Sequence, residues 1–274
     1  MKKVFASAIA LMAVTFSFAQ QNHDVTKQVG DANQAKITQT GFKNSNNTYQ
    51  EGDRNKAQVD QWNKQNDNTI KTYGDDNKVS VLQKGDKNKN FTYQLGNQNN
   101  AATEQYGKEN KVSQYQFGNK NAVYAMQCGT SNESLQEQYG DKNDASSTQY
   151  GKDNSTYQGQ SGTKNKAVAW QNGANNESSQ IQIGDFNFAD SHQLGYDNKV
   201  SQVQVGDQNQ AFAKQDGDRN SISQTQLGNG HFSKDTQIGC DNSIVVIQQP
   251  GSTSTDCCAP PMPTPKCPQG QPGC

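Results

Sequence analysis

The chain has 274 residues, of which 30% are hydrophobic, and its mean hydropathy is −1.06. Its 37 Gln and 31 Asn make up a quarter of the chain, and 25 basic against 26 acidic residues leave a net charge of −1. A globular domain is about 45–50% apolar, so this composition excludes a conventional apolar core and an integral membrane protein. With no basic excess there is no electrostatic case for a nucleic-acid partner. A neutral chain rich in Asn, Gln and Gly is typical of a β assembly held by backbone hydrogen bonds.

The N-terminal segment differs from the rest of the chain. Lys2 and Lys3 form a basic start, the next fifteen residues are apolar but too short to span a bilayer with ordinary flanks, and Ser17-Phe18-Ala19 has the pattern of a cleavage site. We expect residues 1–19 to be a secretory signal peptide, which leaves Gln20 as the mature N-terminus and places the protein outside the cell. A short membrane anchor is the alternative.

From residue 22 onward an eleven-residue unit repeats twenty-one times without insertion or deletion. The unit reads Asn-x-h-x-h-x-Gln-x-Gly-x-x, where h is often small or β-branched. The Gln column has one exception, Thr72, and the Asn column has one, His231. The Gly column has two exceptions, Asn63 and Pro250. Such a register does not arise by chance and indicates a repeat architecture.

Each unit predicts a strand followed by a tight turn. Alternation over residues 33–39 places Asn33, Ala35, Ile37 and Gln39 on one face. The x-Gly-x-x segment that follows predicts a turn, in which Gly supplies the positive φ that a chain reversal needs. A helix is excluded, because Gly and Asn at fixed positions in every unit would each cost helix stability.

A second period of 22 residues appears at the inward position four residues after each Asn. From Gln114 to Gln224, Gln alternates there with Ala or Ser. One coil therefore holds two strands, with a large side chain in one strand opposite a small one in the other. The turns agree with this period. Every second turn from Asp31 to Asn229 carries Asp, Asn or Thr after its Gly, whereas the intervening turns carry Phe42, Lys64, Asp86, Lys108 and a mixture beyond.

We therefore expect an all-β fold over residues 20–248, a β-solenoid of about ten 22-residue coils with two strands per coil. Coils stacked about 4.8 Å apart place each inward amide over its copy. Side-chain amides then pair as ladders, which removes the cost of burying them. The expected structural ladder comprises Gln28, Gly30, Asn33, Gln39, Gly41, Asn44, Gln50, Gly52, Asn55, Gln94, Gly96, Asn99, Gln116, Gly118, Asn121, Gln138, Gly140, Asn143, Gln182, Gly184, Asn187, Gln204, Gly206 and Asn209.

The segment from Gln28 to Gln39, Gln-Val-Gly-Asp-Ala-Asn-Gln-Ala-Lys-Ile-Thr-Gln, resembles the curlin repeat of curli fibre subunits. The resemblance extends from residue 22 to about residue 248. It implies a subunit of an extracellular functional amyloid that serves adhesion and biofilm matrix. The implied partners are further copies of the chain, a curli nucleator and an outer-membrane curli secretion channel, through which the chain would pass unfolded.

This chain departs from the curlin pattern in three ways. Asn replaces the Ser that typically opens the coil, the second Gly of the Gln-x-Gly-x-Gly-Asn turn is usually missing, and there are about twice as many repeats as in the familiar subunits. Whether the chain is a major subunit, a nucleator or an accessory curlin stays open.

The two ends of the repeat suit head-to-tail addition of copies. We expect no N-terminal cap, since the first strand starts at Asn22, and the last unit ends in the β-prone run Ile244 to Gln248. Unpaired edges that are not capped invite a contact between copies that does not close.

Residues 249–274 hold all seven prolines, and Pro cannot donate to a sheet. A disordered tail that blocks edge pairing and a tail that crosslinks or anchors through disulfides are both compatible with this composition. The cysteines available for such crosslinks are Cys257, Cys258, Cys267 and Cys274, whose spacing lacks the close pairs of a zinc site. The pairing of Cys128 and Cys240, in or beside turns, cannot be read from the sequence.

No catalytic site, metal site or cofactor is expected. Asp190-Ser191-His192 contains the residue types of a catalytic triad, but neighbours on a strand point to opposite faces. The glycines form no phosphate-binding motif. A β-helical carbohydrate enzyme needs long irregular loops, for which the gapless units leave no room.

Two surface features have competing interpretations. The Asp-rich turns, such as those of Asp31 and Asp53, either reflect turn chemistry or form a like-charge column that raises the carboxylate pKa values or recruits cations. The second hypothesis predicts faster assembly towards about pH 4–5 or with Ca²⁺. The outward aromatics Tyr93, Tyr115, Tyr157 and Trp170 reflect β propensity, lateral packing of fibrils or adhesion to glycans. A soluble monomeric β-solenoid that binds glycan or ice at its outer faces is therefore the rival of the fibre subunit.

Overall fold

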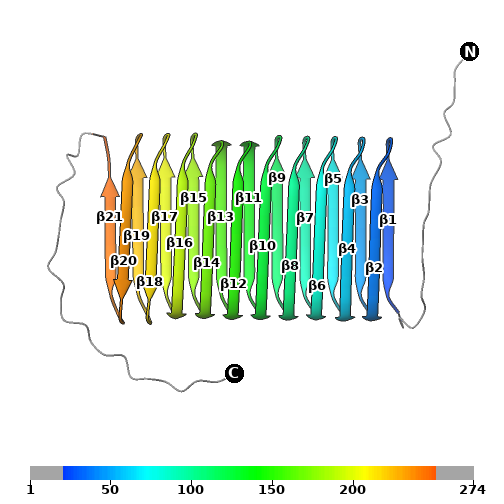
Figure 1. Ribbon diagram of the computed structural model, residues 1–274, viewed down its shortest axis with the longest axis horizontal. Helices are drawn as coiled ribbons and strands as arrows, with labels where there is room; N and C mark the ends of the chain where they lie inside the picture. Colours follow the sequence, from blue (N-terminus) through cyan, green and yellow to red (C-terminus); the bar gives the residue numbers. More distant parts are fainter. Residues whose placement is uncertain (1–20, 251–274) are drawn as a thin grey trace, which may run out of the picture.

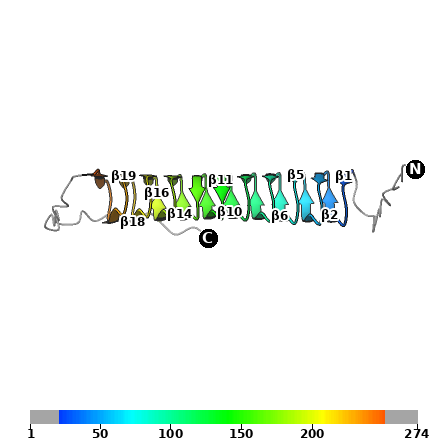
Figure 2. The same cartoon turned by 90° about the horizontal axis from the view of Figure 1, so that it is seen from above.

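A computed structural model describes residues 21–250. Within this range the regular structure consists of 21 strands, which form a flat slab with two layers (Figures 1 and 2). The expected signal peptide lies outside the described residues, as do the tail beyond Pro250 and its four cysteines, Cys257, Cys258, Cys267 and Cys274.

The odd-numbered strands form one layer and the even-numbered strands the other. The odd-numbered strands are β1 (His23–Val29), β3 (Ser45–Glu51), β5 (Asp67–Tyr73), β7 (Lys89–Leu95), β9 (Lys111–Phe117), β11 (Glu133–Asp141), β13 (Ser155–Thr163), β15 (Glu177–Ile183), β17 (Lys199–Val205), β19 (Ser221–Leu227) and β21 (Ser243–Gln248). The even-numbered strands are β2 (Gln34–Phe42), β4 (Lys56–Lys64), β6 (Lys78–Asp86), β8 (Asn100–Lys108), β10 (Ala122–Thr130), β12 (Asp144–Lys152), β14 (Lys166–Ala174), β16 (Phe188–Tyr196), β18 (Gln210–Asp216) and β20 (Phe232–Ile238).

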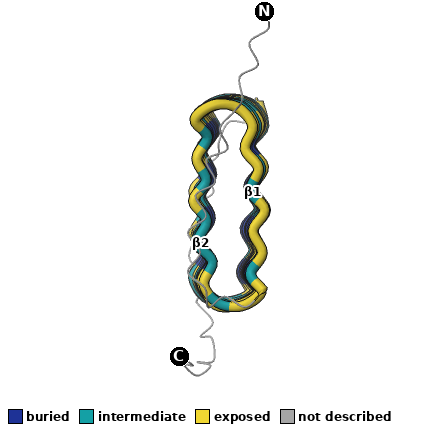
Figure 3. The backbone as a smooth tube through the Cα atoms, turned by 90° about the vertical axis from the view of Figure 1, so that its right-hand side faces the viewer, coloured by how far each residue is buried: buried dark blue, intermediate teal, exposed yellow. Residues whose placement is uncertain are grey.

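Except for β20 and β21, which end the two sheets, every described strand pairs in parallel with the strand that lies 22 residues further along the chain. His23 faces Ser45 and Gln34 faces Lys56, and the same offset holds through an 11-stranded and a 10-stranded sheet. Viewed along the stacking axis, the coils superimpose as one narrow closed ring (Figure 3). The predicted β-solenoid of about ten coils with two strands per coil is confirmed.

The space between the two sheets is filled mainly by amides and small side chains. The inward positions of β9 to β19 carry the predicted alternation, so that Gln136 and Gln158 of one sheet alternate along the chain with Ala125 and Ser147 of the other, all buried. Two apolar clusters lie among the amides: one extends from Ala57 to Ala145, and the other contains Val200, Ala213 and Ile222. The core therefore combines paired amides with mostly small apolar side chains, as the composition indicates.

The strand limits differ from the prediction at both ends of the unit. Each strand begins one residue after the corner Asn, and many strands run for nine residues through the Gly, as β2 does through Gly41. The length depends on the turn. After most odd-numbered strands, the turn N–H donates to the side chain of the Asp or Asn one coil further along, in place of a backbone carbonyl, and the strand ends there. Thr163 interrupts this series of Asp and Asn residues, and β11 and β13 continue to Asp141 and Thr163.

Each turn contains two residues with positive φ, separated by one residue, and the sequence pattern predicts only the first. Gly107 has φ +109°, as expected for the turn glycine, but the second residue after each such Gly also has a positive φ. That residue is almost never Gly: Ala32 has φ 56° and Phe186 has φ 58°. An L-residue in this left-handed region costs roughly 1–2 kcal/mol, so the stacked coils must impose the conformation on every turn.

Adding a side chain is costly at a turn glycine such as Gly107 and much less costly at Gly230, which lies two residues after another turn glycine. A Cβ on Gly107 would collide with the carbonyl of Gly129, while a Cβ on Gly230, which has φ 71°, would meet nothing within 4 Å. We expect Gly107→Ala to lower the free energy of unfolding by about 3 kcal/mol or more, and Gly230→Ala by about 1 kcal/mol. Urea unfolding followed by circular dichroism measures both values, and equal losses would contradict the turn geometry.

Candidate functional site

The corner asparagines form a continuous column at each end of the coils. The Asn44 backbone N–H donates to Oδ1 of Asn22 at 2.9 Å, and Asn44 Nδ2 donates to the carbonyls of Thr40 and Asn63 at 3.2 and 3.1 Å. Asn44 Oδ1 in turn accepts from the Asn66 backbone N–H at 3.0 Å, so this one side chain satisfies three backbone groups at a bend where they would otherwise stay unpaired. This explains why Asn returns at every corner but one.

The glutamines form a second set of columns, which bind both along the stack and across it. Gln116 Nε2 donates to Oε1 of Gln138, one coil further along, at 3.0 Å. It also donates to the carbonyl of Asn100 in β8, on the opposite sheet, at 3.1 Å. In the middle coils an additional Gln column does the same, as when Gln136 donates to Gln158 and to the Tyr124 carbonyl. Each Gln therefore ties two coils together and joins the two sheets.

The structure places the predicted ladder residues in these columns and their glycines in the turns. From Asn44 to Asn209 the predicted Asn and Gln side chains are all buried. In the first coil Asn33 and Gln39 are half-buried and Gln28 is exposed, because no coil lies in front of them. The amides of Gln28 and Gln50 nevertheless lie 2.7 Å apart.

The Gln column has one gap, at Thr72. Thr72 is 1% exposed, and its hydroxyl oxygen has no hydrogen-bond partner. Gln94 Oε1, which would accept from a Gln at position 72, is also buried without a partner. The substitution of one column residue thus leaves two buried polar atoms unsatisfied, which is costly.

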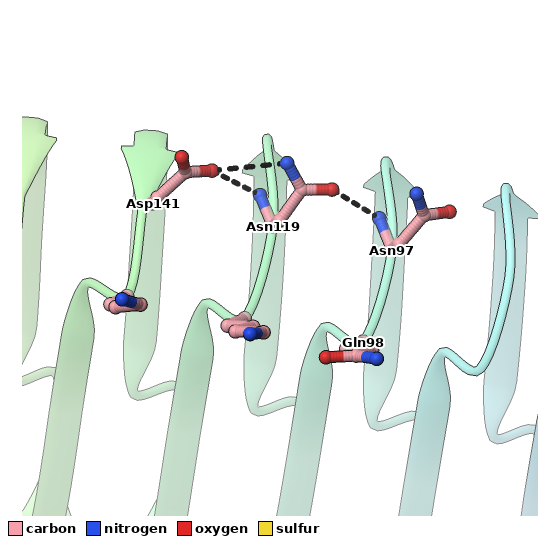
Figure 4. Close-up of a pocket in the computed structure, with 6 residues that line it drawn as sticks. Asn97, Gln98, Asn119 and Asp141 are labelled. Carbon is pink, nitrogen blue, oxygen red and sulfur yellow. Dashed lines mark hydrogen bonds between the residues drawn. The ribbon is translucent and has the colours of Figure 1, made fainter.

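The Asp-rich turns are also a hydrogen-bonded column. The Asn97 N–H donates to Asn119 Oδ1 at 2.9 Å, and the Asn119 N–H donates to Asp141 Oδ1 at 2.7 Å (Figure 4). Together with Gln98, Lys120 and Lys142, these three residues line a shallow hollow of about 450 Å³. The carboxylates thus serve as acceptors for turn N–H groups, which favours the turn-chemistry interpretation. In the range that the structure describes, no group of three or more His, Cys, Asp or Glu residues could hold a metal ion, and the effect of Ca²⁺ stays a prediction.

Charges in the next turn position are paired along the stack. The Arg54 guanidinium binds both oxygens of Asp76 at 2.8 Å, and Arg219 binds Asp241 in the same way. The hydrogen bond from Arg54 lowers the pKa of the Asp76 carboxyl below its usual value. In these two pairs, opposite charges on stacked turns therefore attract one another.

The outward aromatics pack on one another along the stacking axis. Tyr93 contacts Tyr73 and Phe117 with ring centroids 5.7 and 5.5 Å apart, within a run that extends from Tyr49 to Tyr139. The other predicted aromatics behave alike: Tyr115 packs on Phe91, Trp170 lies between Tyr150 and His192, and the Tyr157 hydroxyl donates to Glu137. These contacts half-bury the rings and stabilise each sheet.

The triad-like segment on β16 divides between two faces, as expected for neighbours on a strand. Ser191 is buried, and its hydroxyl lies 2.7 Å from that of Ser178. Asp190 and His192 point outward, where burial raises the pKa of Asp190 and lowers that of His192. Of the two cysteines within residues 21–250, Cys128 is a free thiol and Cys240 is disulfide-bonded.

Comparisons with protein-family models and with curated proteins find no match for this chain. Residues 21–250 include no helix long and apolar enough to cross a membrane. The candidate functional site is the set of amide columns that run the length of the slab.

Filling the gap at position 72 tests the role of the Gln column. We expect Thr72→Gln to raise the free energy of unfolding by about 1–2 kcal/mol, since it gives Gln94 Oε1 a donor. The matched control is Gln116→Thr, which creates the same gap four strands later and is expected to cost at least as much. Urea midpoints of both variants measure the effects. A column that did not contribute to stability would leave both midpoints unchanged.

Proposed function

We propose that this chain is a secreted structural subunit of a curli-like amyloid fibre, which grows by head-to-tail stacking of copies and serves adhesion and biofilm matrix. The observation that carries the proposal is that hydrogen-bonded columns run through the slab and stop at two open ends. Within residues 21–250 no element covers β1 and β2 at one end or β20 and β21 at the other (Figure 1).

The C-terminal end strands carry the most exposed large apolar side chains of the described residues. Ile238, Val245 and Ile247 are 62%, 68% and 61% exposed. Monomeric proteins usually protect sheet edges with charges, prolines, bulges or a cap. Parallel strands in register with open edges are the arrangement from which cross-β fibres are built.

The resemblance of the repeat to curlin supports the cellular part of the proposal. It suggests export through an outer-membrane curli channel, nucleation on the cell surface, and a location outside the cell that agrees with the expected signal peptide at residues 1–19. The rival, a monomeric solenoid that binds glycan or ice, would use the outer faces. There the aromatic rings are occupied with one another, and no flat column of Thr replaces them.

The proposal predicts fibres from the purified chain beginning at Gln20, released from denaturant. We expect a meridional reflection at about 4.7–4.8 Å from the stacked coils. Thioflavin kinetics should show a lag that preformed fibrils remove. A chain that stays monomeric and rich in β structure at high concentration would contradict the proposal, and would direct attention to the outer faces as a ligand surface.

A further inference from the structure

The odd number of strands sets how one copy can follow another. The odd-numbered sheet has 11 strands and the even-numbered sheet has 10, so the solenoid stops half a coil after β20. A copy that continues it without a gap must place its β1 on β20 and its β2 on β21. We infer that consecutive copies join in this way, each rotated by half a coil about the stacking axis. The inference rests on the proposed fibre function.

The inward columns match across this joint. Gln28 would lie on Gln237, Gln39 on Gln248 and Asn33 on Asn242, so that each amide column passes into the next copy. The apolar positions match as well: the half-buried pair Ala35 and Ile37 of β2 would lie on Ile244 and Val246 of β21. On the outer face Val29 would cover Ile238.

The alternative joint stacks the odd-numbered sheet of one copy on the odd-numbered sheet of the next, and this arrangement fits poorly. With β1 on β21, the Asp24 carboxylate would lie on Ile244, and with β2 over β20, Ile37 would lie over Asp235. The shorter sheet would also lack one strand between β20 and the next β2, which leaves backbone groups unpaired. The rotated joint avoids both costs.

The rotated joint collects all the ionisable residues found at inward positions of the described strands and corners. They are Asp24 in β1, Asp235 in β20, and His231, which replaces the corner Asn before β20. Every other inward position between residues 21 and 250 holds an uncharged side chain. In the joint, Asp24 would lie on Ser233, Thr26 on Asp235 and Asn22 on His231.

Neither carboxylate has a charged inward partner in the single copy. Asp24 accepts from Asn46 Nδ2 at 2.6 Å, and Asp235 accepts from Gln224 Nε2 at 2.6 Å. The His231 ring nitrogen Nε2 lies 2.8 Å from the Leu227 carbonyl. The packed strands β2, β3, β18, β19 and β21 present only Ala, Val, Ile, Thr, Asn and Gln inward, so within residues 21–250 no other titratable group on these strands faces the three.

The joint is therefore acid-responsive. Joining would bury the two carboxylates in one interface, and the uptake of protons removes the cost of burying their charges. Because joining takes up protons, it is favoured as the pH falls. The equilibrium constant for joining changes at most tenfold per pH unit for each proton taken up. Inward charges on terminal strands also protect a sheet edge from wrong partners at neutral pH.

Seeded elongation as a function of pH tests this charge cluster. We expect the elongation rate of the unmodified chain to fall about tenfold from about pH 5 to about pH 7.5. Asp24→Asn with Asp235→Asn removes both carboxylates from the joint and should elongate within about twofold across the range. Asn already occupies the inward position of Asp24 in β3, β5 and β7. The matched control, Asp53→Asn with Asp185→Asn, removes two turn carboxylates and should keep the pH dependence.

Two results would overturn the inference: an unchanged pH ratio in the Asp24 and Asp235 variant, or its loss in the turn variant. A failure of the fibre proposal looks different, since no variant would then elongate at any pH.

Charge exchange tests the register of the joint. The rotated joint places Val25 on Lys234 of the neighbouring copy, whereas stacking like sheets places it on Val245. We expect Val25→Lys to slow elongation at low salt, and Lys234→Glu added to it to restore the rate. Lys120→Glu, in the middle of the solenoid, changes the net charge equally and should not restore it. Equal rescue by the two acidic variants, or no rescue, would overturn the half-coil rotation.

Discussion

The structure depends on pairing side-chain amides along the stacking axis. A chain with so few apolar residues cannot fold by hydrophobic burial alone, and unpaired amides would be costly inside it. Stacking similar repeat units solves both problems, because each Asn or Gln pairs with the equivalent residue of the adjacent coil in the same chain. The same pairing demands a fixed repeat length, since an insertion would displace every later column. The gapless register of the sequence follows from this demand.

The amide columns also explain why the fold has no natural end. Each coil completes the hydrogen bonds of the coil beside it, and only the terminal coils keep unsatisfied edges. Asn44 is buried, whereas Asn22, one coil nearer the N-terminal edge, is only half-buried. In the proposed fibre, assembly would be the same process as folding, carried across a chain boundary. The residues that distinguish the terminal strands, such as Asp24 and Asp235, would then govern how copies meet.

Periodicity was sufficient to predict the two sheets, the 22-residue register and the inward placement of Asn and Gln. It could not show the left-handed conformation two residues after each Gly, because residues as different as Ala32, Lys43 and Phe186 adopt it. That conformation comes from the stacked backbone and not from the residue type. The strands that run through Gly41 and its equivalents were missed because their length depends on whether an Asp or Asn side chain accepts the turn N–H in place of the backbone. The gap at Thr72 was visible as an exception, but only the structure shows that it leaves Gln94 without a donor.

Electron cryomicroscopy of fibres grown from the chain that begins at Gln20 tests the central claim most directly. The account predicts uninterrupted Asn and Gln columns through each boundary between copies, with β1 of one copy hydrogen-bonded to β20 of the next. Fibres in which the coils are rearranged, or in which copies associate through the outer faces while the terminal strands stay unpaired, would contradict it.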